Sequence, residues 1–518
     1  MNVKEYDNHQ ALIFPASVGD YLSNDHLAHV VDEAVEEINL SAFYRKISSV
    51  GNPAYHPALM VKIWFYGYAT RTYSSRKIEE RLNTDVAFIY LSGMQKPDFR
   101  TISDFRKNNL NELRNSFVDI LQICHRLGMI QLGNISIDSK VMKASASADR
   151  TYTEKELIEE QEELEKAIQK YLEKANQTDE EDDLKYGSDK RGNELPENIC
   201  DKEQRLKRMK EVVEQLKQAR QKIKESGKEK INLTDESAQF QKDKSRKIPG
   251  YRAHIAVDFK EQVIVANDVT NKQNDSTYLM TMIDKVLENV NRVEPEKFSK
   301  SEPEEPIRIP TDAGYSSSKN LAKLEEEGYR SKVDAYIPDA SERNKRGTRR
   351  RKIDPRFDKS KFIYNRDDDS VLCPEGKKLH HIAKSIQREV LYDVYGNTTE
   401  CKKCQHYGIC TRSERGRYIL ISEYQSFIDK MRKKLSTEEG KKIYGTRKIT
   451  AEPVFGNLSQ NLGFREFLLR KLEKVKGEFS LMCSAHNLLK ISGYLRKIGI
   501  SLGEVLNSSR GIPAMNTS

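Results

Sequence analysis

The chain has 518 residues, and 88 Lys and Arg against 79 Asp and Glu leave a formal net charge of +9. Its most apolar stretch, residues 59–69, is shorter than the roughly 18 apolar residues of a membrane span and contains Lys62, so a membrane protein is excluded. The N-terminus lacks the pattern of a signal peptide, and we expect a cytoplasmic protein. A charge of this size fits a nucleic-acid partner without establishing one.

Residues 1–132 are predicted to be mostly helical. Apolar residues at helical spacing predict four helices, near 27–34, after Pro57, from Ser74 and from Thr101. Short helices around the glycine-containing turn 92–100 are compatible with a helix-turn-helix and a DNA-binding domain. The alternative is an ordinary helical bundle with solvated arginines. In the DNA-binding interpretation, the candidate contacts here are Arg76, Lys77 and Arg106.

Strands and helices then follow one another in the order of an α/β core. Alternating apolar residues predict paired strands over 251–259 and 262–269, joined by a tight hairpin. The other predicted elements are strands at 133–138, 307–310 and 333–337, and helices near 278–290 and 316–327. We expect one core built from residues 133–150, 231–340 and 436–505, interrupted by two insertions and followed by a loose tail at 506–518.

The first insertion, residues 151–230, has apolar seams at heptad spacing in both of its arms. Residues 151–175 hold eight acidic and four basic side chains, whereas 202–230 hold eleven basic and five acidic ones. Opposite charges on neighbouring arms favour an antiparallel coiled-coil hairpin. The alternative is a seam for another subunit.

The second insertion, residues 341–435, opens with seven basic side chains in the ten residues 343–352. Such a dense run of charge favours contact with the phosphates of a polyanion over a merely solvated loop. The candidate phosphate contacts are Arg343, Arg349, Arg350 and Arg351.

Four of the seven cysteines follow in the same insertion. Cys401 and Cys404 have the two-residue spacing of a zinc knuckle, and Cys373 and Cys410 can supply two further thiolates. This pattern predicts a zinc-ribbon-like unit with one structural zinc ion, in preference to incidental free thiols. The substitutes considered are His380, His381 and His406.

Three acids have a sequence context that suits a divalent metal ion. Asp138 ends an apolar strand, Asp312 follows another, and Glu452 is flanked by Arg447 and Lys448. Hard cations such as Mg2+ need oxygen ligands on rigid elements. From the residues alone, four other acids at plausible strand ends remain alternative candidates for metal ligands, namely Asp258, Asp268, Asp334 and Asp339.

Several segments in one order resemble a known family. They are YHPALMVKIWFYGYATRTYSSRKIEERL, DFRTISDFR, IDSKVMKASAS, GYRAHIAVD with VIVANDVTN, TDAGYSS, and EPVFGNLSQNLGFREFLLRKLEKVKGEFSLMCSAHNLLK. Together they are similar to a DDE transposase of a bacterial insertion sequence, of the subgroup with an InsH-like N-terminal domain that is typified by insertion sequence 1182. The resemblance covers most of the chain outside the coiled-coil insertion and the termini.

The resemblance implies an RNase H-like mixed-sheet core, two Mg2+ or Mn2+ ions, and the triad Asp138, Asp312 and Glu452 as catalytic metal ligands. It implies an enzyme that binds double-stranded DNA at transposon ends, cleaves it, and joins the 3'-hydroxyl to target DNA, as a homodimer assembled on DNA in the bacterial cytoplasm and nucleoid. The alternatives are an RNase H-like nuclease that cannot join DNA and a non-catalytic, transposase-derived regulator.

Related transposases often carry a Tyr, Arg, Glu, Lys signature around the glutamate. Tyr444 and either Arg447 or Lys448 fill the first two places, with a spacing that differs by one residue. Ser459 stands seven residues after Glu452, where a lysine is usual. One contact to the DNA end is therefore missing from the signature, and the candidates to supply it are Arg465 and Lys471.

Overall fold

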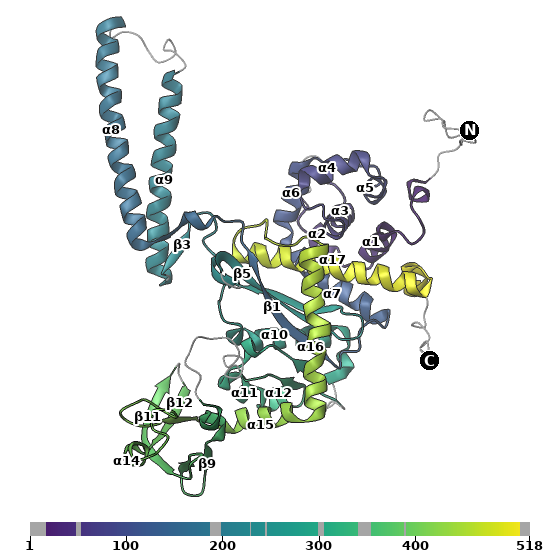
Figure 1. Ribbon diagram of the computed structural model, residues 1–518. Coiled ribbons are helices and arrows are strands. Elements are labelled where there is room, and N and C mark those ends of the chain that lie inside the picture. Colours follow the sequence, from purple (N-terminus) through teal and green to yellow (C-terminus); the bar gives the residue numbers. More distant parts are fainter. Residues whose placement is uncertain are drawn as a thin grey trace, which may run out of the picture.

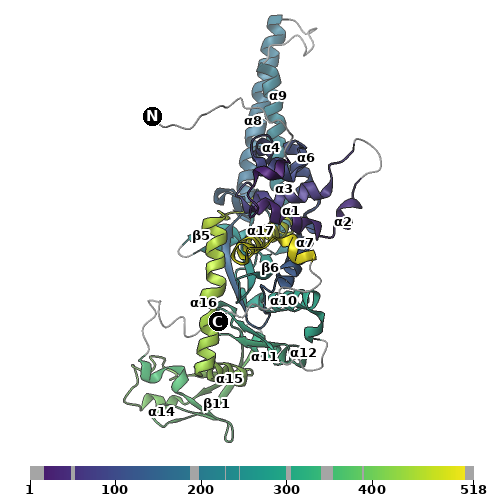
Figure 2. The same ribbon diagram turned by 90° about the vertical axis from the view of Figure 1, so that its right-hand side faces the viewer.

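The computed structural model describes residues 17–47, 53–186, 198–227, 229–243, 246–298, 305–339, 354–387 and 390–507. Helices of the N-terminal region pack on one side of a central α/β core, a pair of long helices projects from the core, and a small β-rich unit lies at its far end (Figure 1). The view turned by 90° shows the helix pair and the β-rich unit at opposite ends of the molecule (Figure 2).

The N-terminal region is a bundle around one buried helix, α3 (Pro57–Ala69). Pro57 suits the first helical turn, and the His56 side chain accepts a hydrogen bond from the Ala58 N–H at 3.2 Å. Trp64 and Tyr68 of α3 are completely buried. The surrounding helices are α1 (Leu27–Glu36), α2 (Ser41–Tyr44), α4 (Ser75–Thr84), α5 (Val86–Leu91), α6 (Phe99–Asn108) and α7 (Leu110–Arg126).

The predicted helix start at Thr101 is wrong, because α6 begins at Phe99. Asp98 precedes the helix with an extended backbone, and its Oδ1 accepts the Thr101 N–H at 2.7 Å. A carboxylate in this position satisfies one of the free N–H groups of the first turn. The short α5 and α6 flank the predicted turn, and Asn109 then separates α6 from α7.

The core sheet is built around β1 (Ile135–Lys143). The long strand β5 (Arg246–Asp258) pairs antiparallel with β1 and with β6 (Ile264–Thr270), so the predicted hairpin is confirmed. On the other side of β1, parallel bridges from Asn134 to Arg308 and from Ile137 to Thr311 join β7 (Ile307–Pro310). β7 pairs in parallel with β8 (Val333–Tyr336). The strand order is therefore β6, β5, β1, β7, β8. A further strand, β4 (Gln239–Asp243), pairs antiparallel with the first residues of β5.

Helices from both halves of the chain cover this sheet. α16 (Glu438–Gly456) lies along β1, and α10 (Leu279–Val293) packs on β6 and α7. The predicted helix 316–327 is instead two short helices, α11 (Ser318–Leu324) and α12 (Glu327–Arg330), the second of which contains Gly328. α17 (Leu472–Ile498) packs on β6, α7 and α3, and so joins the N-terminal bundle to the core, and α18 (Leu502–Asn507) follows it.

His486 of α17 is buried between two elements of the core. Its Nδ1 accepts from the Asn457 amide and its Nε2 donates to the Gln262 carbonyl, both at 3.0 Å. Burial lowers the pKa of His486 to about 4. Only the neutral ring fits both hydrogen bonds, because protonation would set a second N–H against the amide N–H2 group.

We expect this histidine to make stability depend on pH. Well above pH 6.5 both states are neutral and the stability is complete; as the pH falls through 6.5 toward 4, the unfolded chain takes up the proton first, so the free energy of unfolding decreases. Between pH 8 and pH 5 the loss is on the order of 2 kcal/mol. Urea unfolding of His486→Gln should show a smaller loss over this range. An unchanged pH dependence would mean that the ring is charged in the folded protein.

The first insertion contains two long helices, α8 (Glu154–Tyr186) and α9 (Asn198–Ser226). They run antiparallel, because Glu165 pairs with Lys217 while Glu154 pairs with Lys224. Below them, β2 (Thr151–Thr153) pairs antiparallel with β3 (Lys230–Asn232). A small apolar cluster, separate from the main core, holds the base of the helix pair and contains Leu157, Leu216, Ala219, Ile223 and Ile231.

This separate cluster predicts that the helix pair can be removed. Thr153 and Lys230 lie opposite each other, so replacing residues 154–229 by Asn-Gly closes a two-residue hairpin between β2 and β3. We expect the shortened protein to unfold cooperatively, within a few degrees of the full chain in a thermal scan. Loss of cooperative unfolding would show that the helix pair is part of the core.

The β-rich unit is an antiparallel sheet in the order β13, β12, β11, β10, β9. Its small core contains Val371, Leu379, Tyr395 and Ile419. α15 (Gln425–Ser436) leads from it to α16. The remaining elements are β9 (Ile363–Asn365), β10 (Ser370–Leu372), β11 (Lys378–Gln387), β12 (Val390–Gly396), α14 (Thr398–Lys402) and β13 (Ile419–Ser422). In the part of the chain that the structure describes, no helix has the length and apolar character needed to cross a bilayer.

Candidate active site

Asp138 on β1 and Asp312, two residues after the end of β7, lie side by side. The parallel bridge between Ile137 and Thr311 puts the next residue of each segment, Asp138 and Asp312, at the same level. Each carboxylate accepts the following backbone N–H, from Ser139 or Ala313, at 2.8 Å. The sequence places Asp138 at a strand end, and this is wrong: β1 continues to Lys143 because the strand keeps pairing with β5 as far as Gly250.

Glu452 comes to the same place from α16. Arg447, five residues earlier on this helix, donates to Glu452 Oε1 at 2.9 Å and lies 3.5 Å from Asp138 Oδ2. The Arg447 side chain is only 12% exposed, whereas that of Glu452 is 49% exposed. The guanidinium therefore bridges two of the three predicted acids, of which Glu452 is half exposed.

The three acids also act on one another through their charges. Burial raises the pKa of Asp138 to about 6. The Ser139 N–H and Arg447 oppose that shift, whereas the charges of Asp312 and Glu452 add to it. Burial lowers the pKa of Arg447, but the neighbouring carboxylates outweigh burial and raise it overall. A cation is thus strongly favoured at this point.

The site residues fit divalent cations in donor chemistry, although they form no ready-made metal site. Carboxylate oxygens from two strands and a helix are the ligands that Mg2+ prefers. Among the described residues, no three His, Cys, Asp or Glu side chains are close enough together to hold a metal ion. Arg447 provides the positive charge between the acids, and its Nε is buried without a hydrogen-bond partner in the described part of the chain. The guanidinium is therefore incompletely satisfied in this position.

The sequence analysis missed an acid that contacts Ser139, on the opposite face of β1 from Asp138. Asp275 accepts a hydrogen bond from the Ser139 hydroxyl at 2.6 Å and pairs with Arg252 at 2.9 Å. A Cβ atom at Gly314 would come within 2.9 Å of Asp275 Oδ2, so glycine after Asp312 allows this close approach. Asp275 begins a short 3-10 helix, η4 (Asp275–Thr277), in a polar segment where no sequence pattern distinguishes it from other acids.

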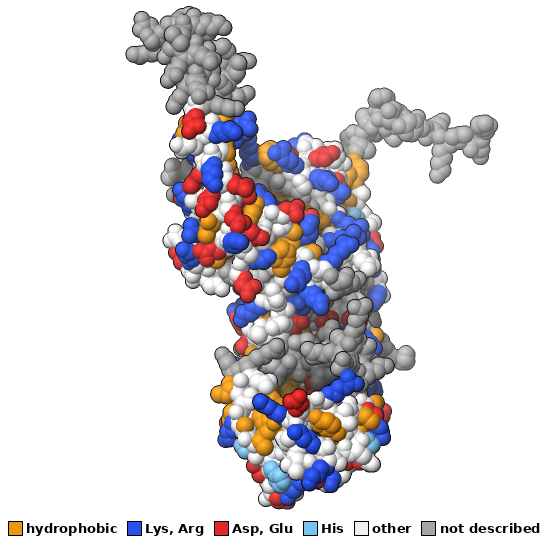
Figure 3. Space-filling model, turned by 60° about the vertical axis from the view of Figure 1, so that its left-hand side comes forward, with side chains coloured by type: hydrophobic (Ala, Val, Ile, Leu, Met, Phe, Trp, Pro, Cys, Tyr) orange, Lys and Arg blue, Asp and Glu red, His pale blue; other side chains and the backbone are white. Residues whose placement is uncertain are grey.

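The predicted basic contacts around Glu452 are accessible. Lys448, Arg465 and Lys471 are exposed, and Tyr444 is half-buried. The helix α16 ends at Gly456, and a π-helical turn, η9 (Asn457–Asn461), and a loop precede α17. Arg465 and Lys471 therefore lie on that loop, at the edge of the core. Figure 3 shows Lys and Arg side chains gathered across the middle of one face.

The three predicted contacts of the N-terminal region differ in their environment. Arg76 and Lys77 are exposed on α4, and the Arg76 guanidinium lies 4.1 Å from the Phe99 ring centroid. Arg106 is buried, stacks 4.2 Å from the Trp64 ring and donates to the Tyr68 hydroxyl. The prediction of Arg106 as a DNA contact is therefore wrong, because protein encloses its charge. The predicted contacts Arg343, Arg349, Arg350 and Arg351 lie outside the described residues.

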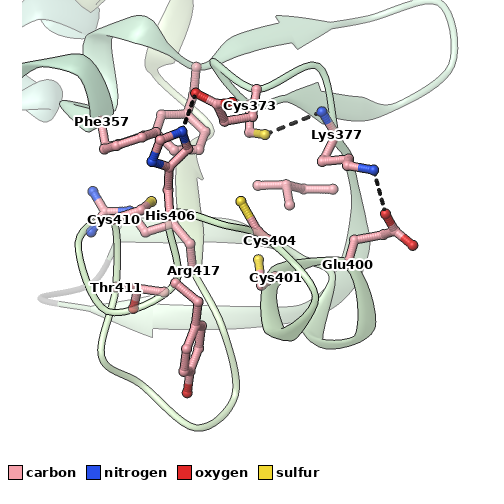
Figure 4. Close-up of a pocket in the computed structure, with 14 residues that line it drawn as sticks. Phe357, Cys373, Lys377, Glu400, Cys401, Cys404, His406, Cys410, Thr411 and Arg417 are labelled. Carbon is pink, nitrogen blue, oxygen red and sulfur yellow. Dashed lines mark hydrogen bonds and ion pairs between the residues drawn. The ribbon is translucent and has the colours of Figure 1, made fainter.

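The four predicted zinc ligands line one cavity of about 30 Å3 in the β-rich unit (Figure 4). All four are free thiols, and the Lys377 N–H points at Cys373 Sγ at 3.3 Å. Burial raises the pKa of the Cys410 thiol, and the other three cysteines add to that rise. His406 lines the same cavity and contacts Glu375 at 3.3 Å. The two other predicted substitutes, His380 and His381, lie on β11 and do not line it.

Two family models match the chain. A transposase DDE domain matches residues 372–492, which include Glu452 but not the other two acids, and a transposase domain matches residues 16–108. No curated protein matches. A solved structure of the piggyBac transposase in a synaptic complex with hairpin DNA is similar over 97% of this chain and 90% of its own length, with 9% sequence identity and a TM-score of 0.23.

The two family matches identify the chain as a DDE-type transposase of the insertion-sequence kind. It is accordingly a DNA transposase, of a family whose members cut and join DNA and generally depend on divalent metal ions.

Proposed function

We propose that this transposase holds two divalent metal ions, Mg2+ or Mn2+, with Asp138, Asp312 and Glu452, and thereby cuts insertion-sequence ends and joins their 3'-hydroxyls to target DNA. The observation that carries this proposal is the meeting of the three segments: a strand bridge sets Asp138 beside Asp312, and Arg447 links Asp138 to Glu452. Three of the other acids at predicted strand ends have different partners: Asp258 accepts the Leu132 N–H, Asp268 pairs with Lys285, and Asp334 pairs with Lys434.

An RNase H-like core is part of the proposal. Its support is the strand order β6, β5, β1, β7, β8, with the first three strands antiparallel and the last two parallel to β1. In this arrangement the central strand and its parallel neighbour present two acids at one level, and a C-terminal helix adds the third. The positions of the acids then follow from the topology of the sheet.

The chain's own residues have distinct parts in the proposed chemistry. Ions bound here would activate the attacking oxygen and stabilise charge on the leaving oxygen. Asp138 and Asp312 are held on paired backbone and provide fixed oxygen atoms, whereas the half-exposed Glu452 faces the entering DNA. Arg447 neutralises the acids while the site is free of cations. Once cations take over this role, the Arg447 guanidinium is available to a DNA phosphate. This division needs no protein nucleophile.

The DNA is proposed to lie across the exposed basic residues near this site. Tyr444 and Lys448 lie on α16 with Glu452, Arg465 and Lys471 lie on the loop after η9, and the exposed Arg76 and Lys77 would extend the positive surface to the N-terminal bundle. We also propose that two copies assemble on the DNA, in the cytoplasm. The basic run 343–352 stays a sequence-based prediction of further phosphate contacts.

A structural zinc ion is a second part of the proposal. The four cysteines that would hold it line one cavity, with Cys401 in α14 and Cys404 just after that helix; among the described residues they would have to move closer together to hold an ion. The apolar core of this unit is small, so cross-linking of its loops by a metal ion would add much of its stability.

The proposal is tested by incubating the purified protein with labelled DNA that carries the element ends and with Mg2+. We expect cuts that leave 3'-hydroxyls at the ends, followed by joined products. A pre-cut end with a free 3'-hydroxyl tests joining alone. Cleavage without joining would indicate a nuclease, and binding without cleavage would indicate a regulator.

A further inference from the structure

Lys140 lies two residues after Asp138 on β1. Both residues pair regularly with β5, Asp138 with Ile255 and Lys140 with Ala253, so their side chains lie on the same face of the strand. That face meets α16 and its continuation. The Lys140 ammonium donates to the Ser459 hydroxyl oxygen at 2.8 Å.

Two contacts join β1 to α16 and the turn after it. Asp138 contacts Arg447, and Lys140, which comes later on β1, contacts Ser459, which comes later in the chain than Arg447. Glu452 lies near the end of α16, and Ser459 lies in the π-helical turn η9 that follows it; Arg447, the partner of Glu452, and Ser459 both contact β1. Asp138 faces Arg447 and Glu452, and Lys140 faces Ser459 one step further along. The Lys140 side chain thus lies one step further along the same face of β1 than Asp138.

The Ser459 hydroxyl orients Lys140 without contributing a charge of its own. Its hydrogen is directed to the Phe455 carbonyl at 2.7 Å, which leaves the oxygen as an acceptor for the ammonium. Ser459 lies in the π-helical turn η9, and such turns are frequent at functional sites. The two bonds hold the Lys140 ammonium against η9, two residues along β1 from Asp138.

We propose that Lys140 binds a backbone phosphate of the DNA end beside the reacting phosphodiester, as a DNA-positioning residue. A lysine serves as a compact point charge for phosphate, and this one comes from the strand that carries Asp138. The Lys140 ammonium contacts Ser459, which stands where the family signature usually has a lysine. The backbone N–H of Lys471, another candidate to replace that lysine, donates to Asp235. The inference rests on the proposed function of the three acids.

The test measures binding of full-length protein to labelled end DNA without divalent metal, over a range of salt concentrations. Lys140→Met keeps the apolar stem and removes the charge, so the slope of log affinity against log salt should fall by about 0.9, the value for one phosphate contact. Lys140→Arg should keep the wild-type slope. Lys143→Met is the control, because this exposed lysine of the same strand pairs with Glu466.

A lysine that only ties β1 to the helix would give a different result. Lys140→Met would then lower the unfolding temperature and keep the wild-type salt slope, which would overturn the inference. If Lys140→Met does not fold, the exchange of Lys140→Ser with Ser459→Lys decides instead. A wild-type slope in that exchanged protein supports the inference, and a slope lower by about 0.9 overturns it.

Cleavage of the same DNA by the wild-type protein in Mg2+ separates this inference from the proposed function. Wild-type cleavage together with an unchanged slope in Lys140→Met refutes only the part played by Lys140. Absence of cleavage by the wild-type protein refutes the proposed function as well, and the inference that rests on it.

Discussion

Replacing Asp138 or Asp312 with Asn, or Glu452 with Gln, is expected to lower both DNA cleavage and joining by at least roughly 1,000-fold, or about 4 kcal/mol. Each amide keeps the size of the side chain but lacks the charge that a hard cation requires. DNA binding should persist and even tighten slightly, because negative charge facing the phosphates is removed. Timed cleavage assays with binding measured in parallel test this separation.

The matched control is Asp339→Asn. Asp339 follows β8, and its carboxylate pairs with Arg432 on α15 and not with Arg447. Asp258 is a poorer control, because it is buried and accepts the backbone N–H groups of Leu132 and Gln131, so its loss would disturb folding. An inactive Asp339→Asn combined with an active Asp312→Asn would show that the assigned triad is wrong.

The second large effect is expected in the β-rich unit. Serine in place of Cys401 or Cys404 removes a thiolate, so the protein should lose its zinc, and a protease should cut within residues 354–424. Zinc contributes roughly 10 kcal/mol or more to the folding of comparably small units. Elemental analysis of protein purified without chelators, together with limited proteolysis, provides the measurement. One zinc ion per chain is expected in the wild type.

Cys200→Ser is the control for this pair, since Cys200 belongs to α9 in the other insertion. It should keep both the metal content and the protease resistance. Wild-type protein without zinc, or serine variants with an unchanged metal content, would contradict the assignment of the four cysteines.

The sequence predicts elements well where a local signal fixes them. Pro57 marks the start of α3, and strict alternation of apolar residues gives the β5–β6 hairpin and β7. The extent of β1 is not predictable locally, because the strand beyond Asp138 is polar and exists through its pairing with β5. The start of α6 depends on the carboxylate of Asp98, which competes with an equally plausible cap at Thr101.

Parts of the candidate site likewise cannot be predicted from local sequence patterns. The three acids were chosen by resemblance, since several other acids have similar contexts. Arg106 has the charge of a DNA contact, and only the packing of Trp64 and Tyr68 reveals that it is buried. Lys140 is separated from Ser459 by more than 300 residues, so their contact depends on the way α16 lies along β1.

The most direct test of the central claim locates the metal ions themselves. Fe2+ in place of Mg2+ generates hydroxyl radicals in the presence of ascorbate and peroxide, and these radicals cut the polypeptide next to the bound ion. The account predicts cuts close to positions 138, 312 and 452 together, suppressed by excess Mg2+ and lost in Asp138→Asn. Cuts confined to other segments, with these three positions intact, would contradict it.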